Sequence, residues 1–156
     1  MTARIFNLVL TTIIFLTAMP SLNASDAPKA ALTVSPLRKS DIDYGCGCSF
    51  HYPPRLEYKG ATVLQWHLGN KGNLRVNNRT YRLSVQPEYL IATPKVGDVV
   101  SFGLQGEDLT VSVECRITRV CGEKDEACEV TLMRGRMTVQ KENDRAQLPV
   151  WGNCGC

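Results

Sequence analysis

Residues 109–120 of the 156-residue chain read LTVSVECRITRV and alternate apolar with polar side chains over most of their length. Because successive side chains of a strand point to opposite sides, this alternation predicts a β-strand with one dry and one wet face. The dry face would carry Leu109, Val111, Val113, Cys115 and Ile117. The wet face would carry Thr110, Ser112, Glu114, Arg116 and Thr118. Such one-sided burial is typical of antiparallel sheets.

Two hairpins extend this pattern along the chain. The strand at 109–120 would turn at the charged residues 122–127 and return through residues 128–140. Earlier in the chain, residues 74–85 (LRVNNRTYRLSV) alternate on both sides of the Asn77-Asn78 pair. Asparagine accepts the positive φ angles of a tight hairpin turn, so we expect the chain to reverse there.

Seven short β-rich runs, separated by Gly, Asn, Asp or Pro, account for most of the chain after residue 60. They are residues 62–68, 73–77, 80–86, 98–104, 109–120, 128–140 and 146–151. We therefore expect an all-β fold, a single antiparallel β-barrel or sandwich of about seven short strands, stapled by disulfides. The sequence leaves barrel and sandwich open, because strand pairing across the middle of the chain leaves no mark in one sequence.

The start of the chain has the pattern of a secretory signal peptide, residues 1–24. An almost unbroken apolar run at 5–19 leads to an expected cleavage after Ala24. The run is shorter than the roughly 20 apolar residues that a spanning helix needs. We expect a periplasmic or extracellular product with no stable membrane anchor; a retained anchor is the alternative. Residues 25–44 would form a flexible lead-in, and residues 45–156 a single β domain.

The composition restricts the class of function. The chain is 44% hydrophobic and 21% charged, and its formal net charge is +3. This composition is globular, and a charge so close to neutral argues against a nucleic-acid partner. The sequence contains no G-x-S-x-G, H-E-x-x-H, phosphate-loop or dinucleotide-binding pattern. We expect a domain that is not an enzyme, with no catalytic residues and no cofactor.

The most specific motif occurs twice, at opposite ends of the expected β domain. Cys46-Gly47-Cys48 begins the domain, and Cys154-Gly155-Cys156 ends the chain. Residues two apart in a strand lie on the same face about 6.5 Å apart, and glycine between them removes any clash. If the first and last strands pair, as closing a barrel requires, the four sulfurs gather on one face.

Three chemistries compete for the sulfurs of Cys46, Cys48, Cys154 and Cys156. Two disulfides, for instance Cys46 with Cys156 and Cys48 with Cys154, are favoured because an exported chain meets an oxidising environment. A four-thiolate site for Cu(I) or Zn(II), to which His51 could add an imidazole, is the first alternative. A redox-active C-x-C dithiol that exchanges disulfides is the second.

The other three cysteines have simpler interpretations. Cys121 and Cys128 flank the tip of the second hairpin, where opposing strand ends come within bridging range, so we expect a hairpin disulfide. Cys115 lies on the dry face of its strand and would be a free, buried thiol.

Strand alternation predicts which side chains of the run at 62–68 face the core. In the run at 62–68, the core face would carry Leu64, Trp66 and Leu68. The face toward water or a partner would carry Val63, Gln65 and His67. Trp66 and Trp151 are expected to be core aromatics, and Trp151 would pack over the sulfur cluster. His51 is expected at the surface or half-buried, unless it joins a metal site.

Exposed arginines are the remaining functional signal. They are Arg75, Arg79 and Arg82 beside the first hairpin turn, and Arg116, Arg119, Arg134 and Arg136 on or near the second hairpin. Arg75, Arg79, Arg82, Arg134 and Arg136 are the candidate partner-binding residues. An anionic glycan, lipid headgroup or acidic protein would suit them, but a solvated face paired with Glu114 and the acidic tip of the second hairpin is the more common arrangement. We expect an exported structural or partner-binding module with an envelope or extracellular partner.

Overall fold

A computed structural model describes residues 31–53, 60–67, 69–86, 93–121 and 129–156. Within these residues the chain forms nine strands and one short 3-10 turn, Lys39–Asp41. The strands are β1 (Val34–Ser35), β2 (Gly47–His51), β3 (Thr62–His67), β4 (Lys71–Val76), β5 (Arg79–Val85), β6 (Val99–Gln105), β7 (Leu109–Arg119), β8 (Val130–Lys141) and β9 (Asp144–Gly155). The all-β fold expected from the sequence is confirmed.

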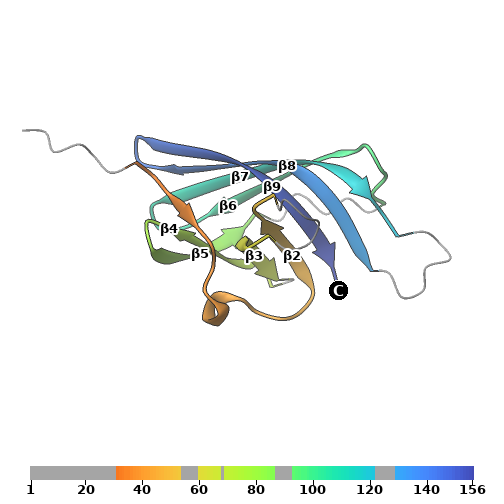
Figure 1. The fold of residues 1–156 in the computed structure, drawn as a ribbon, viewed down its shortest axis with the longest axis horizontal. Coiled ribbons are helices and arrows are strands. Elements are labelled where there is room, and N and C mark those ends of the chain that lie inside the picture. The colour runs from red at the N-terminus through yellow and green to blue at the C-terminus, as the bar shows by residue number, and fades with distance from the viewer. Residues whose placement is uncertain (1–30, 54–59, 68, 87–92, 122–128) are drawn as a thin grey trace, which may run out of the picture.

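The strands close into a single antiparallel barrel (Figure 1). Each strand from β2 to β9 pairs with the next one, and β9 pairs back with β2. The short strand β1 lies outside this ring of eight and pairs with β4 through Val34 and Ser35. The fold is therefore a barrel and not a sandwich, and each barrel strand has a partner on both sides.

The barrel has eight strands, one more than the seven runs expected from the sequence, and β1 lies outside it. Each of the seven predicted runs corresponds to a barrel strand, and the eighth, β2, contains the second half of the first C-G-C motif. β9 also runs further than expected, to Gly155, because its last residues pair with both β2 and β8. Alternation of apolar residues missed these segments because glycine and cysteine take the place of aliphatic side chains there.

Both predicted hairpins are confirmed. Val76 at the end of β4 pairs with Arg79 at the start of β5, and Asn77 and Asn78 have φ angles of 47° and 67°. Asparagine tolerates this left-handed backbone conformation better than most residues. In the second hairpin, Val113 of β7 pairs with Met137 of β8. The expected tip, residues 122–127, lies outside the described residues.

The hydrophobic core fills the inside of the barrel. The dry face predicted for β7 is buried, from Leu109 to Ile117. Phe50 stacks on Trp66 with 5.2 Å between ring centroids, and Phe102 lies 5.0 Å from Trp66. Trp66 is thus a core aromatic, as expected, and so is Leu64, whereas Leu68 lies outside the described residues.

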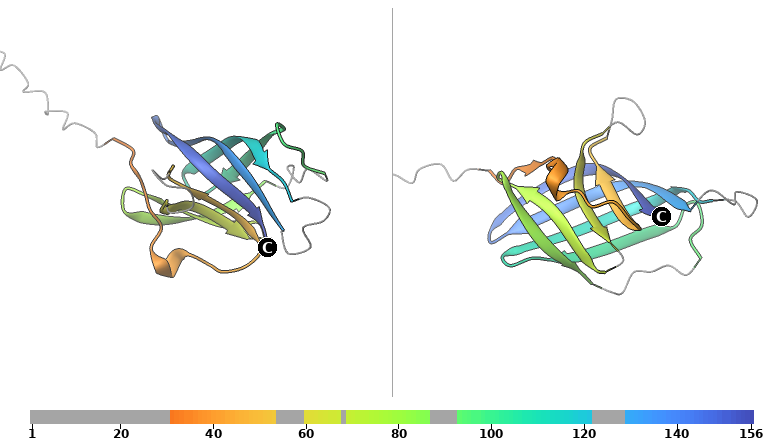
Figure 2. Two further views of the ribbon diagram at one scale, coloured as in Figure 1. Left: turned by 45° about the vertical axis from the view of Figure 1, so that its right-hand side comes forward. Right: turned by 90° about the horizontal axis from the view of Figure 1, so that it is seen from below.

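The outer side of β3 is not open to water, which corrects the expectation for two of its residues. Val63 is fully buried and Gln65 is 9% exposed, although both lie on the face expected to be wet. Residues 31–44, within the expected lead-in, run along the outside of the barrel beside β3 and β4 (Figure 2). The amide of Gln65 accepts a hydrogen bond from the Asp43 backbone N–H at 3.0 Å and donates one to its carbonyl at 2.7 Å.

Candidate functional site

The two C-G-C motifs meet where β2 pairs with β9. Cys48 lies directly opposite Cys154, and Gly47 lies opposite Gly155. Disulfides join Cys46 to Cys156 and Cys48 to Cys154, with Cα–Cα distances of 4.2 and 4.0 Å. This is the pairing proposed from the sequence. We call these two bridges the clip.

The glycine within each motif is required by close approach of a neighbouring strand. A Cβ atom at Gly47 would overlap the carbonyl oxygen of Trp66 in β3, and one at Gly155 would overlap the carbonyl oxygen of Glu129 beside β8. A Cβ at Gly45, just before the first motif, would come no closer than 3.8 Å to the His67 ring. Glycine therefore does more than separate two cysteines, because it lets the backbones of adjacent strands meet.

The clip leaves no thiolate for the metal or redox chemistry that the sequence allowed. In this structure the four sulfurs form two disulfide bonds. The described residues contain no group of three or more His, Cys, Asp or Glu side chains that could hold a metal ion. The Cu(I) or Zn(II) site and the dithiol remain predictions for a reduced chain.

His51 lies away from the clip. Alternation along β2 puts Cys48 and Phe50 on the inner face and His51 on the outer one. Its Nδ1 lies 3.2 Å from the Thr62 hydroxyl. Burial lowers the pKa of His51, against a smaller raising effect of a backbone hydrogen bond with Gly60. The ring is therefore neutral at pH 7 and offers a hydrogen-bonding group without charge.

The remaining cysteines lie apart from the clip. Cys121 is disulfide-bonded, and its sulfur also lies 3.1 Å from the backbone N–H of Val130. Its expected partner, Cys128, is outside the described residues. Cys115 is free and 1% exposed, and burial, with a smaller contribution from the charge of Glu114, raises its pKa to about 12. The thiol is thus protonated at neutral pH, as a structural cysteine would be.

The candidate arginines do not form one surface. Arg75, Arg79 and Arg82 belong to β4 and β5, whereas Arg134 and Arg136 belong to β8. Arg75 donates to Asn78 and to the Pro36 carbonyl, and Arg79 pairs with Glu107 at 3.1 Å. The barrel places two strands between β5 and β8, so any site formed by Arg134 and Arg136 excludes the first three.

Arg82 lines a cavity of about 640 Å³ between the lead-in and the barrel. Asp41, Asp43, His67 and Lys71 line the same cavity, so charges of both signs meet there. His67 Nε2 lies 3.2 Å from the carboxylate of Asp43. His67 thus faces outward as expected, but its partner is the chain's own lead-in.

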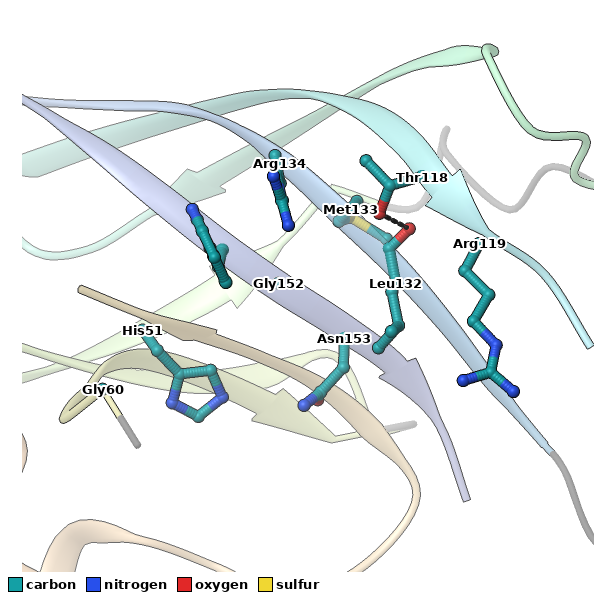
Figure 3. A pocket seen from close by; sticks show the side chains of 10 residues that line it. His51, Gly60, Thr118, Arg119, Leu132, Met133, Arg134, Gly152 and Asn153 are labelled. Atoms are coloured by element: carbon teal, nitrogen blue, oxygen red, sulfur yellow. Dashed lines mark hydrogen bonds between the residues drawn. The ribbon is translucent and has the colours of Figure 1, made fainter. Parts of the chain in front are cut away.

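Trp151 is not a core aromatic, which corrects the sequence-based assignment. Its neighbours Val150 and Gly152 are buried, so the alternation of β9 turns Trp151 to the outer face. It lies beside Arg134 of β8, whose guanidinium carbon is 4.0 Å from the centre of the indole ring. Figure 3 shows Arg134, His51 and Asn153 around the pocket that Trp151 also lines. Trp151 therefore faces away from the sulfurs.

Two cavities on this outer face meet at Arg134. The first, of about 540 Å³, is lined by residues that include His51, Arg119, Leu132, Arg134, Trp151 and Asn153. The second, of about 990 Å³, is lined by residues that include Ser112, Glu114, Arg116, Arg136, Thr138, Arg145 and Gln147, and again by Arg134. We call the two cavities together the arginine groove.

The arginine groove is strongly cationic. Among the residues that line it, five are arginines and one, Glu114, is acidic. In the β6–β7–β8 register, Arg116 lies directly opposite Arg134, and Glu114 opposite Arg136. Arg116 donates to the Gly97 carbonyl at 2.6 Å, which fixes its position at the edge of the groove. The arrangement suits an anionic ligand or partner.

Sequence reasoning missed two parts of the groove. Arg145 was not singled out because it lies before the strand expected at 146–151, and β9 in fact begins at Asp144. Trp151 was placed inside because large aromatic residues are usually buried. Alternation of side chains along β9 could have identified Arg145 and Trp151, since Arg145, Gln147 and Trp151 lie on one side of the strand.

Comparisons with models of protein families, with curated proteins and with solved structures found no match for this chain. Within the residues that the structure describes, no helix has the length and apolar character needed to cross a membrane. The geometry of the arginine groove and the clip therefore carries the functional argument.

Proposed function

We propose that this protein is an exported, disulfide-clipped β-barrel, not an enzyme, that binds an anionic partner through the arginine groove. The observation that carries the proposal is the stack of Arg134 on Trp151, at the point where the two cavities meet. The other four arginines of the groove line the same two cavities, so an anion bound in either cavity lies near positive charge.

The stack prepares Arg134 for recognition of an anion. A guanidinium is planar and carries its N–H donors around its edge, in a geometry that matches the two oxygens of a carboxylate. Packing one flat side of the guanidinium on the indole ring restricts the rotation of the side chain. Less conformational entropy is then lost when a ligand binds.

Export is supported by the cysteine chemistry. Disulfides persist in oxidising compartments, and two of them join the ends of the described domain. The signal-like pattern at residues 1–24 is an independent observation from the sequence. A periplasmic or extracellular location satisfies both.

Binding to a soluble polyanion tests the proposed function. We would measure binding of the exported, oxidised protein to poly-glutamate by biolayer interferometry, at salt concentrations from roughly 0.02 to 0.5 M, where screening becomes strong. The test variant is Arg134→Ala with Arg136→Ala, and the matched control is Arg75→Ala with Arg79→Ala, which removes the same charge from β4 and β5.

The wild type and the control are expected to bind with affinity that falls as salt rises, and the Arg134/Arg136 variant to bind about tenfold more weakly, which corresponds to roughly 1.4 kcal/mol. Absence of binding to poly-glutamate and to every other polyanion tried, at the lowest salt, would overturn the proposal. So would equal losses in the two double variants, because binding would then depend on net charge and not on the groove.

A further inference from the structure

The shape of the arginine groove and its mixture of charged and neutral groups point to one class of anion. We infer that the occupant is an acidic polysaccharide, a chain of sugars that carry carboxylates. This inference rests on the proposed function and adds the chemistry of the partner to it.

The groove is long enough for a chain. It extends from His51 on β2 across β9, β8 and β7 to Val99 on β6. Five neighbouring strands with about 4.8 Å between them span roughly 19 Å. Each of the two cavities has the volume of a small-ligand site, and the shared Arg134 joins them in series. A polymer of several units would fill both.

Neutral hydrogen-bonding groups alternate with the charges along this path. His51 and Asn153 lie in the first cavity with Arg134, and Gln147 and Thr138 lie in the second with Arg136. The Gln147 amide donates to the Thr138 hydroxyl at 3.2 Å, so both groups are held in place. A sugar acid needs this combination, because it presents hydroxyl groups and one carboxylate on the same ring.

The first cavity also offers an apolar surface. The indole ring of Trp151 and the side chain of Leu132 line it together. One face of a pyranose ring carries only C–H bonds, and such a face gains free energy by packing on apolar side chains. The sugar unit in the first cavity could therefore place its carboxylate on an arginine and its apolar face on Trp151 and Leu132.

An acidic peptide fits the same groove less well. In one recurring mode of recognition, an extended peptide gains affinity by pairing its backbone with the edge of a sheet. β7, β8 and β9 each pair with a strand on both sides, so their backbones already have partners. A peptide would have to rely on side chains alone.

A membrane surface is also a weaker match. A bilayer is flat, whereas the Arg134–Trp151 stack lines a hollow between strands. The best exposed aliphatic side chains, Val96 and Val99, lie at the β6 end and not around the stack. Lipid headgroups would therefore reach the rim of the groove more easily than its centre.

Isothermal titration of the full exported protein with four probes tests the inference. The probes are oligogalacturonate, its methyl ester, poly-glutamate with the same number of carboxylates, and vesicles of phosphatidylglycerol in phosphatidylcholine. The methyl ester keeps the sugar and removes the charge, and poly-glutamate keeps the charge and removes the sugar. Circular dichroism and the melting temperature confirm that each variant is folded.

Oligogalacturonate is expected to bind about tenfold more tightly than the methyl ester or poly-glutamate. Arg134→Lys keeps the charge and loses the planar guanidinium, so it should weaken the binding of oligogalacturonate by about fivefold. Gln147→Ala should weaken the binding of oligogalacturonate and leave the affinity for poly-glutamate unchanged. Arg79→Ala should change the affinity for neither probe.

The other outcomes separate the two proposals. Equal affinity for poly-glutamate and oligogalacturonate would overturn the polysaccharide inference and leave the proposal of an anionic partner standing. Binding to vesicles alone would also overturn the polysaccharide inference, and the anionic partner would then be a lipid surface. Equal affinity for oligogalacturonate and its methyl ester would show a site for neutral sugars, which contradicts both. Absence of binding to all four probes at low salt would also reject both.

Discussion

Strand alternation turns one side of β3 and one side of β8–β9 outward, and these two outer faces differ in the folded protein. On β3, Gln65 is buried beside the lead-in and bonded to the Asp43 backbone, and Val63 is fully buried. On β8 and β9, Arg134, Arg136 and Arg145 remain exposed. Strand alternation decides which side chains enter the barrel, but a segment from elsewhere in the chain decides whether an outward side chain meets water.

The same contrast separates the two sets of arginines. Arg75 and Arg79, near the covered face, are satisfied by the chain's own carbonyl, amide and carboxylate groups. The lining of the arginine groove holds five arginines and one acidic side chain, Glu114, although Arg116 also donates to the Gly97 carbonyl. The covered side of the barrel is thus organised for stability, and the exposed side has the charge pattern of a binding surface.

The clip joins these two regions, so breaking it should have the largest effect on stability. The bridges close chain segments of 110 and 106 residues, and one lies within the other. In the chain-entropy model, loss of one bridge costs about 2 kcal/mol, because the other still closes the long loop, and loss of both costs about 7 kcal/mol. Urea unfolding of single and double Cys→Ala pairs would measure these values.

Additive losses of stability from the two bridges would contradict this nested arrangement. If loss of Cys46–Cys156 and loss of Cys48–Cys154 each cost half of the combined loss, the bridges would act independently and not as one nested clip. A fully unfolded four-alanine variant agrees with the prediction, since about 7 kcal/mol is comparable to the whole stability of a domain.

The glycine of the first motif should show the next largest effect, on the covered side. Gly47→Ala would push a methyl group into the Trp66 carbonyl and separate β2 from β3. Overpacking of this kind costs about 2 to 3 kcal/mol. Gly45→Ala is the matched control, since its new methyl group would meet only the His67 ring at 3.8 Å. Thermal unfolding of both variants tests the difference, and equal melting temperatures would remove the steric argument.

A matched pair of glutamines compares the two faces directly. Gln65 makes two hydrogen bonds with the backbone of Asp43 on the covered face, and Gln147 makes one with Thr138 on the exposed face. Gln65→Ala should lower the free energy of unfolding by about 2 kcal/mol, because it also leaves the Asp43 backbone without these partners. Gln147→Ala should stay within about 0.5 kcal/mol. A larger loss at Gln147 would mean that the exposed face also contributes to stability.

The stack itself is expected to contribute less to stability than Gln65 does. Arg134→Ala removes a cation–π contact on a half-exposed ring, which contributes about 0.5 to 1 kcal/mol. The same substitution should weaken binding of the anionic partner strongly. A fall in melting temperature as large as that of Gln65→Ala would show that the stack of Arg134 on Trp151 stabilises the fold as much as the covered face does.

Several features of the fold and of the candidate site could be predicted from single segments. The dry face of β7 and the turn at Asn77-Asn78 follow from local alternation and from the backbone preference of asparagine. Two cysteines on one face of each terminal strand made the pairing within the clip one of the arrangements that the sequence allowed, and the pairing of β2 with β9 selects it. The burial of Val63 and the outward position of Trp151 could not be obtained in this way, because each depends on a neighbouring chain segment or on the true limits of its strand.

The sequence by itself determined that the protein is all-β, which side chains of β7 fill the interior, and which cysteines can bridge. These properties depend on residues a few positions apart, whose relative directions are set by the geometry of a strand. Only the tertiary structure decided that the sheet closes as a barrel, that the lead-in covers β3, and that Arg134 stacks on Trp151 between two cavities. These properties depend on residues that are distant in sequence, and they arise only when closure of the barrel brings separate strands into register.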